Sequence, residues 1–267
     1  MRLRALVPTG HGINCERETA HALSLGGFDE VDQIHLNFLV RGDTDIGRYQ
    51  LIAFPGGFLD GDDLGAAQAC ANRLRHSRVS GERLIDRIEA FVRNGGLVLG
   101  ICNGFQLLVK LGMLPALGGD YRRRDVTLTH NDSGRFENRW VHLTVDPLSP
   151  CIFTKGITSL YLPVRHGEGK IIGRDSSVVR EIGSAHQAPL RYSLPGCTAP
   201  TTEYPFNPNG AEQAIAGICD GTGRVFGLMP HPEAYLHRTN HPRWTREDLP
   251  EEGGGLMIFR NAARFLN

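Results

Sequence analysis

The sequence lacks an excess of charge of either sign and lacks long hydrophobic runs. Its 267 residues carry 29 Lys and Arg against 29 Asp and Glu, so the formal net charge is zero. This balance gives no electrostatic reason to expect a nucleic acid or an anionic membrane as partner. No apolar stretch has the length of a membrane span, and the short apolar run at the N-terminus does not suffice for a signal-peptide core.

Closely spaced cysteine pairs are also missing. Six cysteines are spread along the chain without a CxxC motif: Cys15, Cys70, Cys102, Cys151, Cys197 and Cys219. In a chain of this length, the pattern differs from a small disulfide scaffold and indicates reduced thiols in the cytoplasm. His231, His237 and His241 lie in one segment but match no recognised zinc-ligand spacing, and no Walker-type glycine loop is present. We therefore expect no metal ion and no cofactor in this chain.

What the sequence does contain is an alternation of strand and helix signals. Hydrophobic residues make up 40% of the chain, enough for a substantial core. The pattern predicts strands at residues 2–7, 31–36, 51–54, 97–101, 214–219 and 225–229, and helices at 16–25, 82–93, 104–111 and 256–266. This alternation favours a mostly parallel central sheet with helices on both faces. We expect one α/β domain spanning residues 1–267.

The middle of the chain departs from the alternation. Residues 125–191 are strand-like and rich in turn residues, which predicts an antiparallel strand addition to the same domain. Residues 193–210 are rich in Pro, Gly, Thr and Asn and indicate a long surface loop. The polar segment 238–255 ends in three glycines. It predicts a second irregular insertion into the strand–helix alternation, just before the closing helix.

The sharpest chemical signal is a cysteine between a predicted strand and a predicted helix, within Gly100-Ile101-Cys102-Asn103-Gly104. This G-x-C-x-G pattern is the nucleophile elbow with cysteine in the serine position. Glycines on both sides remove side chains that would collide in a tight turn, and a helix N-terminus stabilises a thiolate. The alternative is a core cysteine flanked by glycines, because the motif is short.

A second signal is the segment Met229-Pro230-His231-Pro232-Glu233 at the end of an apolar strand. Pro232 favours an extended backbone at His231, and residues two apart in an extended chain project to the same side. Glu233 can then orient His231 while His231 faces a nucleophile, as in a catalytic triad. The alternative is a solvated His and Glu in a surface loop.

A third signal is Pro55-Gly56-Gly57 after the predicted strand at 51–54. Adjacent glycines allow a backbone shape that exposes N–H groups as an anion site. In an acyl-transfer enzyme this provides one half of an oxyanion hole. The alternative is a plain turn.

The order P-G-G, G-x-C-x-G-x-Q and H-P-E resembles the class I (triad) glutamine amidotransferases, which have a flavodoxin-like fold. Three further segments narrow the resemblance to the glutaminase component of phosphoribosylformylglycinamidine synthase: G-x-N-C-[DE]-x-E at 12–18, G-R-F-E-x-R-W at 134–140 and L-P-[VI]-x-H-G-E-G at 162–169. The resemblance runs from the N-terminus to the last predicted helix. Asn138 stands where that family often has cysteine.

The resemblance implies a role for each residue of a catalytic centre. Cys102 would be the nucleophile, His231 the base and later the acid, and Glu233 the group that orients His231. The backbone N–H groups of Gly57 and Asn103 would form the oxyanion hole. The enzyme would hydrolyse glutamine through a glutamyl thioester and release ammonia.

The resemblance also implies substrate contacts and a partner. Gln106 would lie near the bound glutamine, and Phe136 and Glu137 would contact its backbone atoms. Ammonia would pass to a separate synthetase subunit, with a small accessory subunit as a further possible partner. That synthetase, rather than this chain, would bind ATP, Mg²⁺ and the formylglycinamide ribonucleotide.

Two other functions remain open at this stage: a free-standing γ-glutamyl hydrolase and a catalytically silent regulatory subunit. The segments at 134–140 and 162–169 favour the purine enzyme over the hydrolase, and the intact triad disfavours a silent subunit. We expect structural or partner-facing roles for His166 and Glu168, and a packing or interface role for Cys15.

Overall fold

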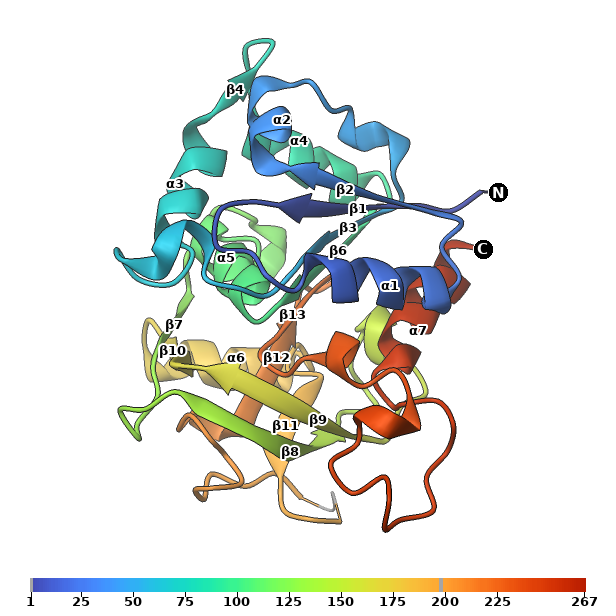
Figure 1. The fold of residues 1–267 in the computed structure, drawn as a ribbon. Coiled ribbons are helices and arrows are strands. Elements are labelled where there is room, and N and C mark those ends of the chain that lie inside the picture. Colours follow the sequence, from blue (N-terminus) through green and yellow to red (C-terminus); the bar gives the residue numbers. More distant parts are fainter. Residues whose placement is uncertain (1, 197–198) are drawn as a thin grey trace.

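The structure, a computed structural model, describes residues 2–196 and 199–267, so Cys197 lies outside the described residues. Among these residues, nine strands form one sheet in the order β2-β1-β3-β6-β13-β12-β11-β8-β9. The first five strands of this order are parallel to one another: β2 (Glu30–His35), β1 (Arg4–Thr9), β3 (Leu51–Phe54), β6 (Leu97–Ile101) and β13 (Val225–Leu228). The predicted parallel sheet is therefore confirmed (Figure 1).

The other four strands of the sheet are antiparallel, and two of them, at 137–145 and 159–166, lie wholly within the stretch 125–191 that was predicted to add antiparallel strands. The four are β12 (Ile215–Cys219), β11 (Leu190–Ser193), β8 (Glu137–Val145) and β9 (Ser159–His166), each antiparallel to its neighbour. Two small antiparallel pairs lie apart from the main sheet: β7 (Val126–His130) with β10 (Glu168–Gly173), and β4 (Arg78–Val79) with β5 (Glu82–Arg83).

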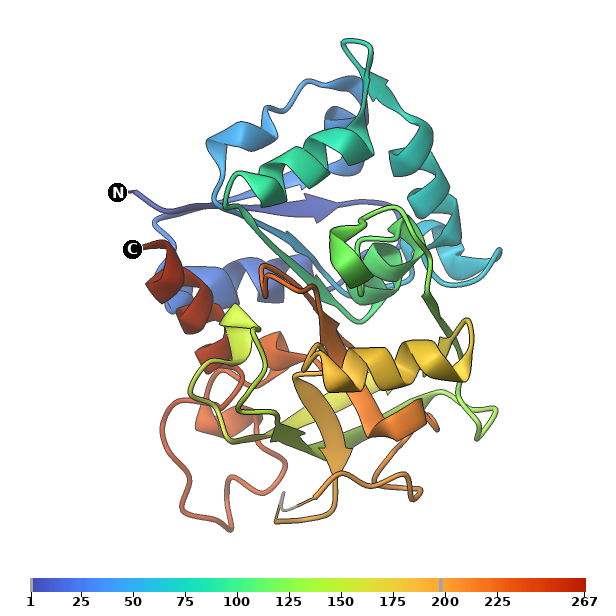
Figure 2. The ribbon, with the colours of Figure 1, turned by 180° about the vertical axis from the view of Figure 1, so that it is seen from behind.

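Helices cover both faces of the sheet, as predicted. On one face α1 (Glu16–Gly26) packs against α7 (Leu256–Leu266), and both lie in front of the sheet in Figure 1. The opposite face, turned to the viewer in Figure 2, carries α3 (Gln68–His76), α4 (Leu84–Arg93), α5 (Asn103–Leu111) and α6 (Ser176–Ser184). A short helix, α2 (Leu36–Arg41), follows β2 directly. Single 3-10 turns occupy Ile46–Arg48, Leu59–Asp62, Leu117–Gly119, Ile152–Thr154, Glu212–Ala214, Pro232–Ala234 and Arg238–Asn240.

Two of the differences from the sequence prediction concern α6 and α4. Helix α6 interrupts the stretch 125–191, which was predicted to be strand-like throughout. Its N-cap is Asp175, whose carboxylate accepts hydrogen bonds from the N–H groups of Ser177 and Val178. The helix predicted at 82–93 begins only at Leu84, because residues 82 and 83 pair with β4.

The centre of the sheet is the most apolar part of the molecule. Every residue of β6 and β13 is buried. This burial explains why their sequences are continuous apolar runs rather than alternating ones, since helices cover both faces. The two central strands therefore form a rigid base for whatever follows their C-terminal ends.

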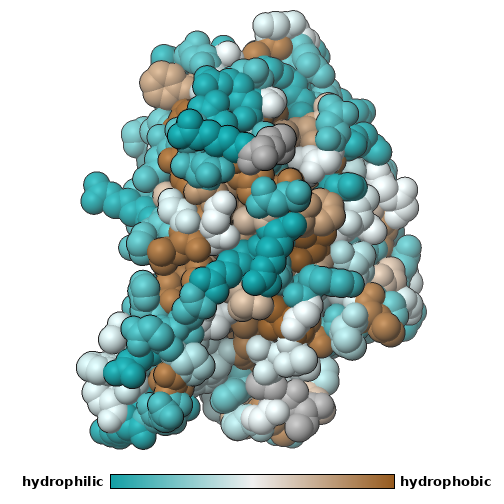
Figure 3. Space-filling model, turned by 90° about the vertical axis from the view of Figure 1, so that its right-hand side faces the viewer, coloured by the Kyte–Doolittle hydropathy of each residue, from teal (hydrophilic) through white to brown (hydrophobic). Residues whose placement is uncertain are grey.

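The described cysteines are all free: Cys15, Cys70, Cys102, Cys151 and Cys219. Among the described residues, no helix combines the length and apolar character needed to cross a bilayer. On the side of the molecule that bears the two termini, apolar side chains form separate patches between hydrophilic ones (Figure 3).

Candidate active site

Cys102 occupies a tight turn between β6 and α5, as the nucleophile-elbow motif predicts. Its backbone dihedrals are φ 52° and ψ −105°, a region that residues with a side chain rarely adopt. A Cβ at Gly104 would collide with the carbonyl oxygen of Phe54, and one at Gly100 would lie 2.7 Å from the carbonyl oxygen of Gly104. Both flanking positions thus require glycine, which explains the motif.

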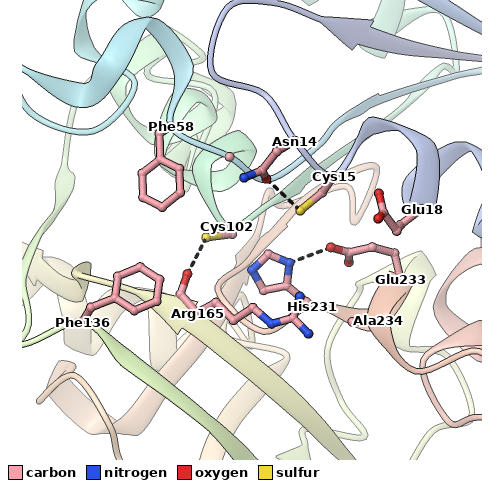
Figure 4. Close-up of a pocket in the computed structure, with 11 residues that line it drawn as sticks. Asn14, Cys15, Glu18, Phe58, Cys102, Phe136, Arg165, His231, Glu233 and Ala234 are labelled. Carbon is pink, nitrogen blue, oxygen red and sulfur yellow. Dashed lines mark hydrogen bonds and ion pairs between the residues drawn. The ribbon is translucent and has the colours of Figure 1, made fainter. Parts of the chain in front are cut away.

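His231 and Glu233 follow β13, the strand next to β6, so they lie beside Cys102 (Figure 4). Nδ1 of His231 lies 2.6 Å from Oε1 of Glu233, and both side chains are buried. His231 has the extended backbone that Pro232 was predicted to impose, with φ −104° and ψ 92°. Glu233, however, lies in a 3-10 turn rather than in extended chain. The turn, not strand alternation, brings the carboxylate to the imidazole.

The surroundings of His231 favour its protonated form. Burial opposes the charge, but the Glu233 carboxylate and the Cys102 sulfur together raise the pKa of His231 well above its ordinary value. Nε2 of His231 is buried and has no hydrogen-bond partner among the described residues. In Figure 4 the ring lies between Cys102 and Glu233. The ring can therefore exchange a proton with a group bound at Cys102.

The N–H groups of Gly57 and Asn103 are available for an oxyanion. The carbonyl oxygen of Gly56 accepts hydrogen bonds of 3.4 Å from the N–H groups of Asn14 and Cys15. In a trans peptide the N–H points opposite to the carbonyl, so the Gly57 N–H is directed away from that loop. Among the described residues, neither the Gly57 N–H nor the Asn103 N–H donates to a protein acceptor. Gly57 also borders the same cavity as Cys102.

The side chain of Asn103 links the two segments that carry the predicted oxyanion donors. Its Oδ1 accepts a hydrogen bond of 3.0 Å from the N–H of Leu59, two residues beyond Gly57. Its Nδ2 donates to Oε1 of Gln106 at 2.9 Å and to the carboxylate of Asp62. Burial raises the pKa of Asp62. The loop that carries Gly57 is thereby tied to the first turn of α5.

Two cavities meet at Cys102 in the part of the chain that the structure describes. The larger, of about 380 Å³, extends past Cys15 and Glu18 towards Glu233, and the smaller, of about 220 Å³, extends past Gln106. The residues common to both are Gly57, Phe58, Cys102, Phe136 and Arg165. Cys102 thus borders a cavity in each of two directions.

The predicted substrate contacts differ in their placement. Gln106 lines the smaller cavity, and its Nε2 donates a hydrogen bond of 2.5 Å to the carbonyl oxygen of Glu168. Phe136 borders both cavities. Glu137 borders neither of these cavities, and its buried carboxylate pairs with Arg139. The geometry therefore favours Gln106 and Phe136, but not Glu137, as substrate contacts.

Three residues lie closer to the centre than the sequence indicated. Cys15, assigned a packing or interface role, lines the larger cavity and lies beside His231. Arg165 and Phe58 were not predicted at all; the carbonyl oxygen of Arg165 lies 3.6 Å from the Cys102 sulfur. The G-x-N-C motif around Cys15 was a visible signal. Arg165 occupies the variable position of the motif at 162–169, and Phe58 follows Pro55-Gly56-Gly57, but neither motif assigned these two residues a role.

His166 is a second buried histidine beside the smaller cavity. Its Nδ1 lies 3.1 Å from Oδ1 of Asn131. Burial, reinforced by the charge of His231, lowers the pKa of His166 to about 3. His166 is therefore neutral near pH 7, unlike His231.

The donor atoms of Cys15, His231 and Glu233 lie within 4.8 Å of one another, close enough in principle to hold a metal ion. The hydrogen bond from His231 to Glu233 already occupies two of these groups. This hydrogen bond accounts for the closeness of His231 and Glu233 without an ion, and the expectation of no metal stays a prediction.

Comparison with known proteins agrees with this geometry. Residues 2–266 match the family model described as a CobB/CobQ-like glutamine amidotransferase domain. The chain is 44% identical over 264 residues to the phosphoribosylformylglycinamidine synthase subunit PurQ of Dehalococcoides mccartyi, covering 99% of this chain and 98% of the relative. It is 36% identical over 270 residues to the subunit of the same name from Archaeoglobus fulgidus, covering 96% and 94%.

A solved structure supports the same assignment. The structure of PurLQS from Thermotoga maritima contains a chain with a TM-score of 0.71 and 29% identity, and the match covers 100% of both chains. The chain therefore belongs to the CobB/CobQ-like glutamine amidotransferase family, within which its full-length relatives are phosphoribosylformylglycinamidine synthase subunits.

Proposed function

We propose that this chain is the glutaminase subunit of phosphoribosylformylglycinamidine synthase and supplies ammonia for purine biosynthesis. The observation that carries the proposal is the placement of Cys102 and of the hydrogen-bonded pair His231 and Glu233 at the ends of adjacent parallel strands. Such a nucleophile, base and orienting carboxylate suit acyl transfer.

In the first half of the reaction, the Cys102 thiolate attacks the side-chain amide carbon of glutamine. The carbonyl oxygen becomes an oxyanion, which the N–H groups of Gly57 and Asn103 stabilise. The protonated His231, held by Glu233, gives its Nε2 proton to the departing nitrogen. The C–N bond breaks, ammonia leaves, and a glutamyl thioester remains on Cys102.

In the second half, water hydrolyses the thioester. Neutral His231 takes a proton from the water, whose oxygen attacks the thioester carbon to form a second oxyanion at the same two N–H groups. The C–S bond breaks and the γ-carboxylic acid leaves, losing its proton to solvent to become glutamate, while the Cys102 thiolate and protonated His231 are restored. The raised pKa of His231 suits this cycle, because the starting state needs the proton on the imidazole.

The smaller cavity is the better site for the glutamine side chain. Gln106 forms part of its wall and is fixed from both ends, since Nε2 donates to Glu168 and Oε1 accepts from Asn103. A wall fixed in this way holds the substrate in one orientation beside Cys102, which favours the reaction.

The partner in this proposal is a synthetase subunit that works with this chain in the cytoplasm. The synthetase binds ATP, Mg²⁺ and the formylglycinamide ribonucleotide, and it consumes the ammonia. A small accessory subunit completes the assembly. The similar chain from Thermotoga maritima was solved as part of PurLQS, which supports a multi-subunit arrangement.

The decisive experiment compares Cys102→Ser with Cys70→Ser in the complex reconstituted with its synthetase. Cys70 is a buried thiol outside both cavities and serves as the matched control. We expect Cys102→Ser to lose glutamine-dependent turnover by about 10⁴-fold or more, while ammonium-dependent synthesis continues. Cys70→Ser should keep both activities.

Three outcomes would contradict the proposal. Retained glutamine turnover in Cys102→Ser would exclude Cys102 as nucleophile. Hydrolysis of γ-glutamyl substrates without any response to the synthetase would indicate a free-standing hydrolase. A wild-type complex that uses only ammonium would indicate a silent subunit.

A further inference from the structure

A separate cavity of about 590 Å³ lies at the opposite end of β13 from His231. Arg224 precedes this strand and lines the cavity, whereas His231 follows the strand. The four residues of β13 alone separate the two ends by about 13 Å. The cavity volume falls within the range of about 300–1,000 Å³ typical of small-molecule sites.

The walls of this cavity are strongly cationic. Lys155, Arg224 and Arg264 line it, and no Asp or Glu does so among the described residues. None of these three cations forms an ion pair within the described part of the chain, where many other arginines do. The C-terminal end of α7 contributes roughly half a negative charge, which three full positive charges outweigh. The cavity therefore attracts an anion.

Hydrogen-bonding groups in the cavity are held in place but not fully used. Asn261 donates its two amide hydrogens to the carbonyl oxygens of Phe153, at 3.0 Å, and Lys155, at 2.8 Å. These bonds fix the Lys155 segment against α7 and leave Oδ1 of Asn261 as an acceptor. The buried Nε–H of Arg224 has no acceptor among the described residues. A buried donor without a partner is costly, and a ligand oxygen would satisfy it.

An aromatic ring completes the cavity. Phe265 lines it, and 48% of the residue is exposed to solvent. The guanidinium carbon of Arg224 lies 5.9 Å from the centroid of this ring. An exposed aromatic face beside cations is the combination on which a nucleobase stacks while its phosphate is neutralised.

We propose that this cavity is a binding site for a nucleotide. The phosphate lies among Lys155, Arg224 and Arg264, and the base stacks on Phe265 with an exocyclic amino group donating to Oδ1 of Asn261. The site is distinct from the glutaminase centre, and the inference does not depend on the proposed function.

The first test is calorimetric titration of the full chain with AMP, ribose 5-phosphate and inorganic phosphate. We expect saturable AMP binding that weakens with rising salt concentration, because part of the attraction is electrostatic. AMP should bind about tenfold more tightly than ribose 5-phosphate, because only AMP stacks on Phe265. No saturable AMP binding at millimolar concentrations would overturn the proposal. Equal affinity for AMP and inorganic phosphate would reduce the site to a general anion site and would also overturn it.

The second test locates the binding. Arg264→Gln and Lys155→Gln should each weaken AMP binding about tenfold or more, since each removes a charged hydrogen-bond donor to phosphate. Phe265→Leu should weaken AMP binding but leave ribose 5-phosphate binding unchanged. The matched control is Arg260→Gln on the same helix, because Arg260 pairs with Glu252 outside the cavity. Thermal unfolding verifies that each variant is folded. AMP affinity that is equal in Arg264→Gln and Arg260→Gln would place the binding elsewhere.

Discussion

At the scale of single residues, the backbone of Cys102 is under strain. A non-glycine residue in a sparsely populated region costs about 1–3 kcal/mol, which the surrounding structure must offset. Cys102, with φ 52° and ψ −105°, is in such a region. This backbone conformation places the Cys102 side chain at both cavities. The position of the sulfur therefore comes with a lower folding stability.

A stability measurement can detect this strain. Cys102→Gly should be more stable than Cys102→Ala by about 1 kcal/mol or more, because glycine adopts the Cys102 backbone conformation without strain. The control is Ala90→Gly at an exposed position of α4, which should destabilise the protein by about 1 kcal/mol. Urea unfolding gives the free energy of unfolding for Cys102→Gly against Cys102→Ala, and for Ala90→Gly against the wild type. Alanine proving more stable than glycine at position 102 would show that the turn is relaxed.

The buried neutral His166 should make stability depend on pH on the acid side. Its folded pKa of about 3 lies below the ordinary value of 6.5, so the unfolded chain binds a proton that the folded chain does not. Its stabilising effect is therefore complete above pH 6.5 and is lost as the pH falls from 6.5 towards 3. At pH 5 the loss amounts to about 2 kcal/mol.

The measurement compares the free energy of unfolding at pH 7 and pH 5 for wild type and His166→Gln. The difference between the two pH values should shrink by about 2 kcal/mol in the variant. His231 acts in the opposite direction: its raised pKa gives stability below pH 6.5 that is lost at higher pH. An unchanged pH dependence in His166→Gln would mean that His166 is protonated in the folded protein.

At the scale of secondary-structure elements, Asn103 joins the start of α5 to the loop after β3. Asn103→Ala should destabilise the protein by about 1–3 kcal/mol, because the buried Leu59 N–H loses its acceptor. It should also lower kcat, although the Asn103 backbone N–H remains, since the Gly57 loop loses its anchor. Steady-state glutaminase assays and urea unfolding check the two effects.

The control for this variant is Gln68→Ala. It removes a side-chain hydrogen bond of 3.2 Å to Asn72 on the exposed side of α3. It should change neither kcat nor stability by a measurable amount. If Asn103→Ala matched this control in kcat, the link between the two halves of the oxyanion site would have no catalytic role.

The central strands, and the meeting of Cys102, His231 and Glu233 at their ends, could be predicted from the sequence because the signals are local. Strands β3, β6 and β13 are continuous apolar runs, and each ends in a Gly or Pro motif that carries site residues. Helix α6 was missed although Val178, Val179 and Ile182 face the core on a helical period. Two adjacent valines also fit a strand, and the strand-like sequence around them favoured the prediction of a strand.

The shape of the cavities could not be predicted in the same way. Cys15, Phe58, Phe136, Arg165 and Glu233 come from widely separated segments that meet only through tertiary packing. The placement of Glu137 could not be predicted for a related reason: Phe136 and Glu137 are neighbours in sequence, but only Phe136 borders a cavity at Cys102. Glu137 and Arg139 are two residues apart in β8, so their side chains project to the same side of the strand and pair there.

At the scale of the whole molecule, the Gly56–Gly57 peptide offers a point where a partner can act. Its carbonyl is held by two hydrogen bonds of 3.4 Å, which are long and therefore weak. A peptide between two glycines rotates easily, so docking of a synthetase could fix the Gly57 N–H towards the oxyanion. A Cβ at Gly56 would lie 2.9 Å from Cε1 of His231, which keeps the position free of side chains.

We therefore expect the isolated chain to be a poor glutaminase. Adding the synthetase, its nucleotide and its acceptor substrate should raise kcat by about 10²–10³-fold, the value of one oxyanion donor. KM should change less, because the donor acts mainly in the transition state. Steady-state glutamine hydrolysis with and without the partner measures both constants. Equal kcat in the two cases would mean that the oxyanion hole is complete in the free chain.

Cys102 and His231, the proposed nucleophile and base, follow neighbouring central strands, and we expect this placement to govern how heat inactivates the enzyme. β6 and β13 are fully buried and hydrogen-bonded to each other, so their amides belong to the last group to exchange with deuterium. Cys102 and His231 can separate only when this central pair opens, which is global unfolding. The mostly exposed segment at 242–252 can fray at lower temperature without disturbing them. Loss of activity on heating should therefore coincide with deuterium uptake in β6 and β13, and not with the earlier uptake at 242–252.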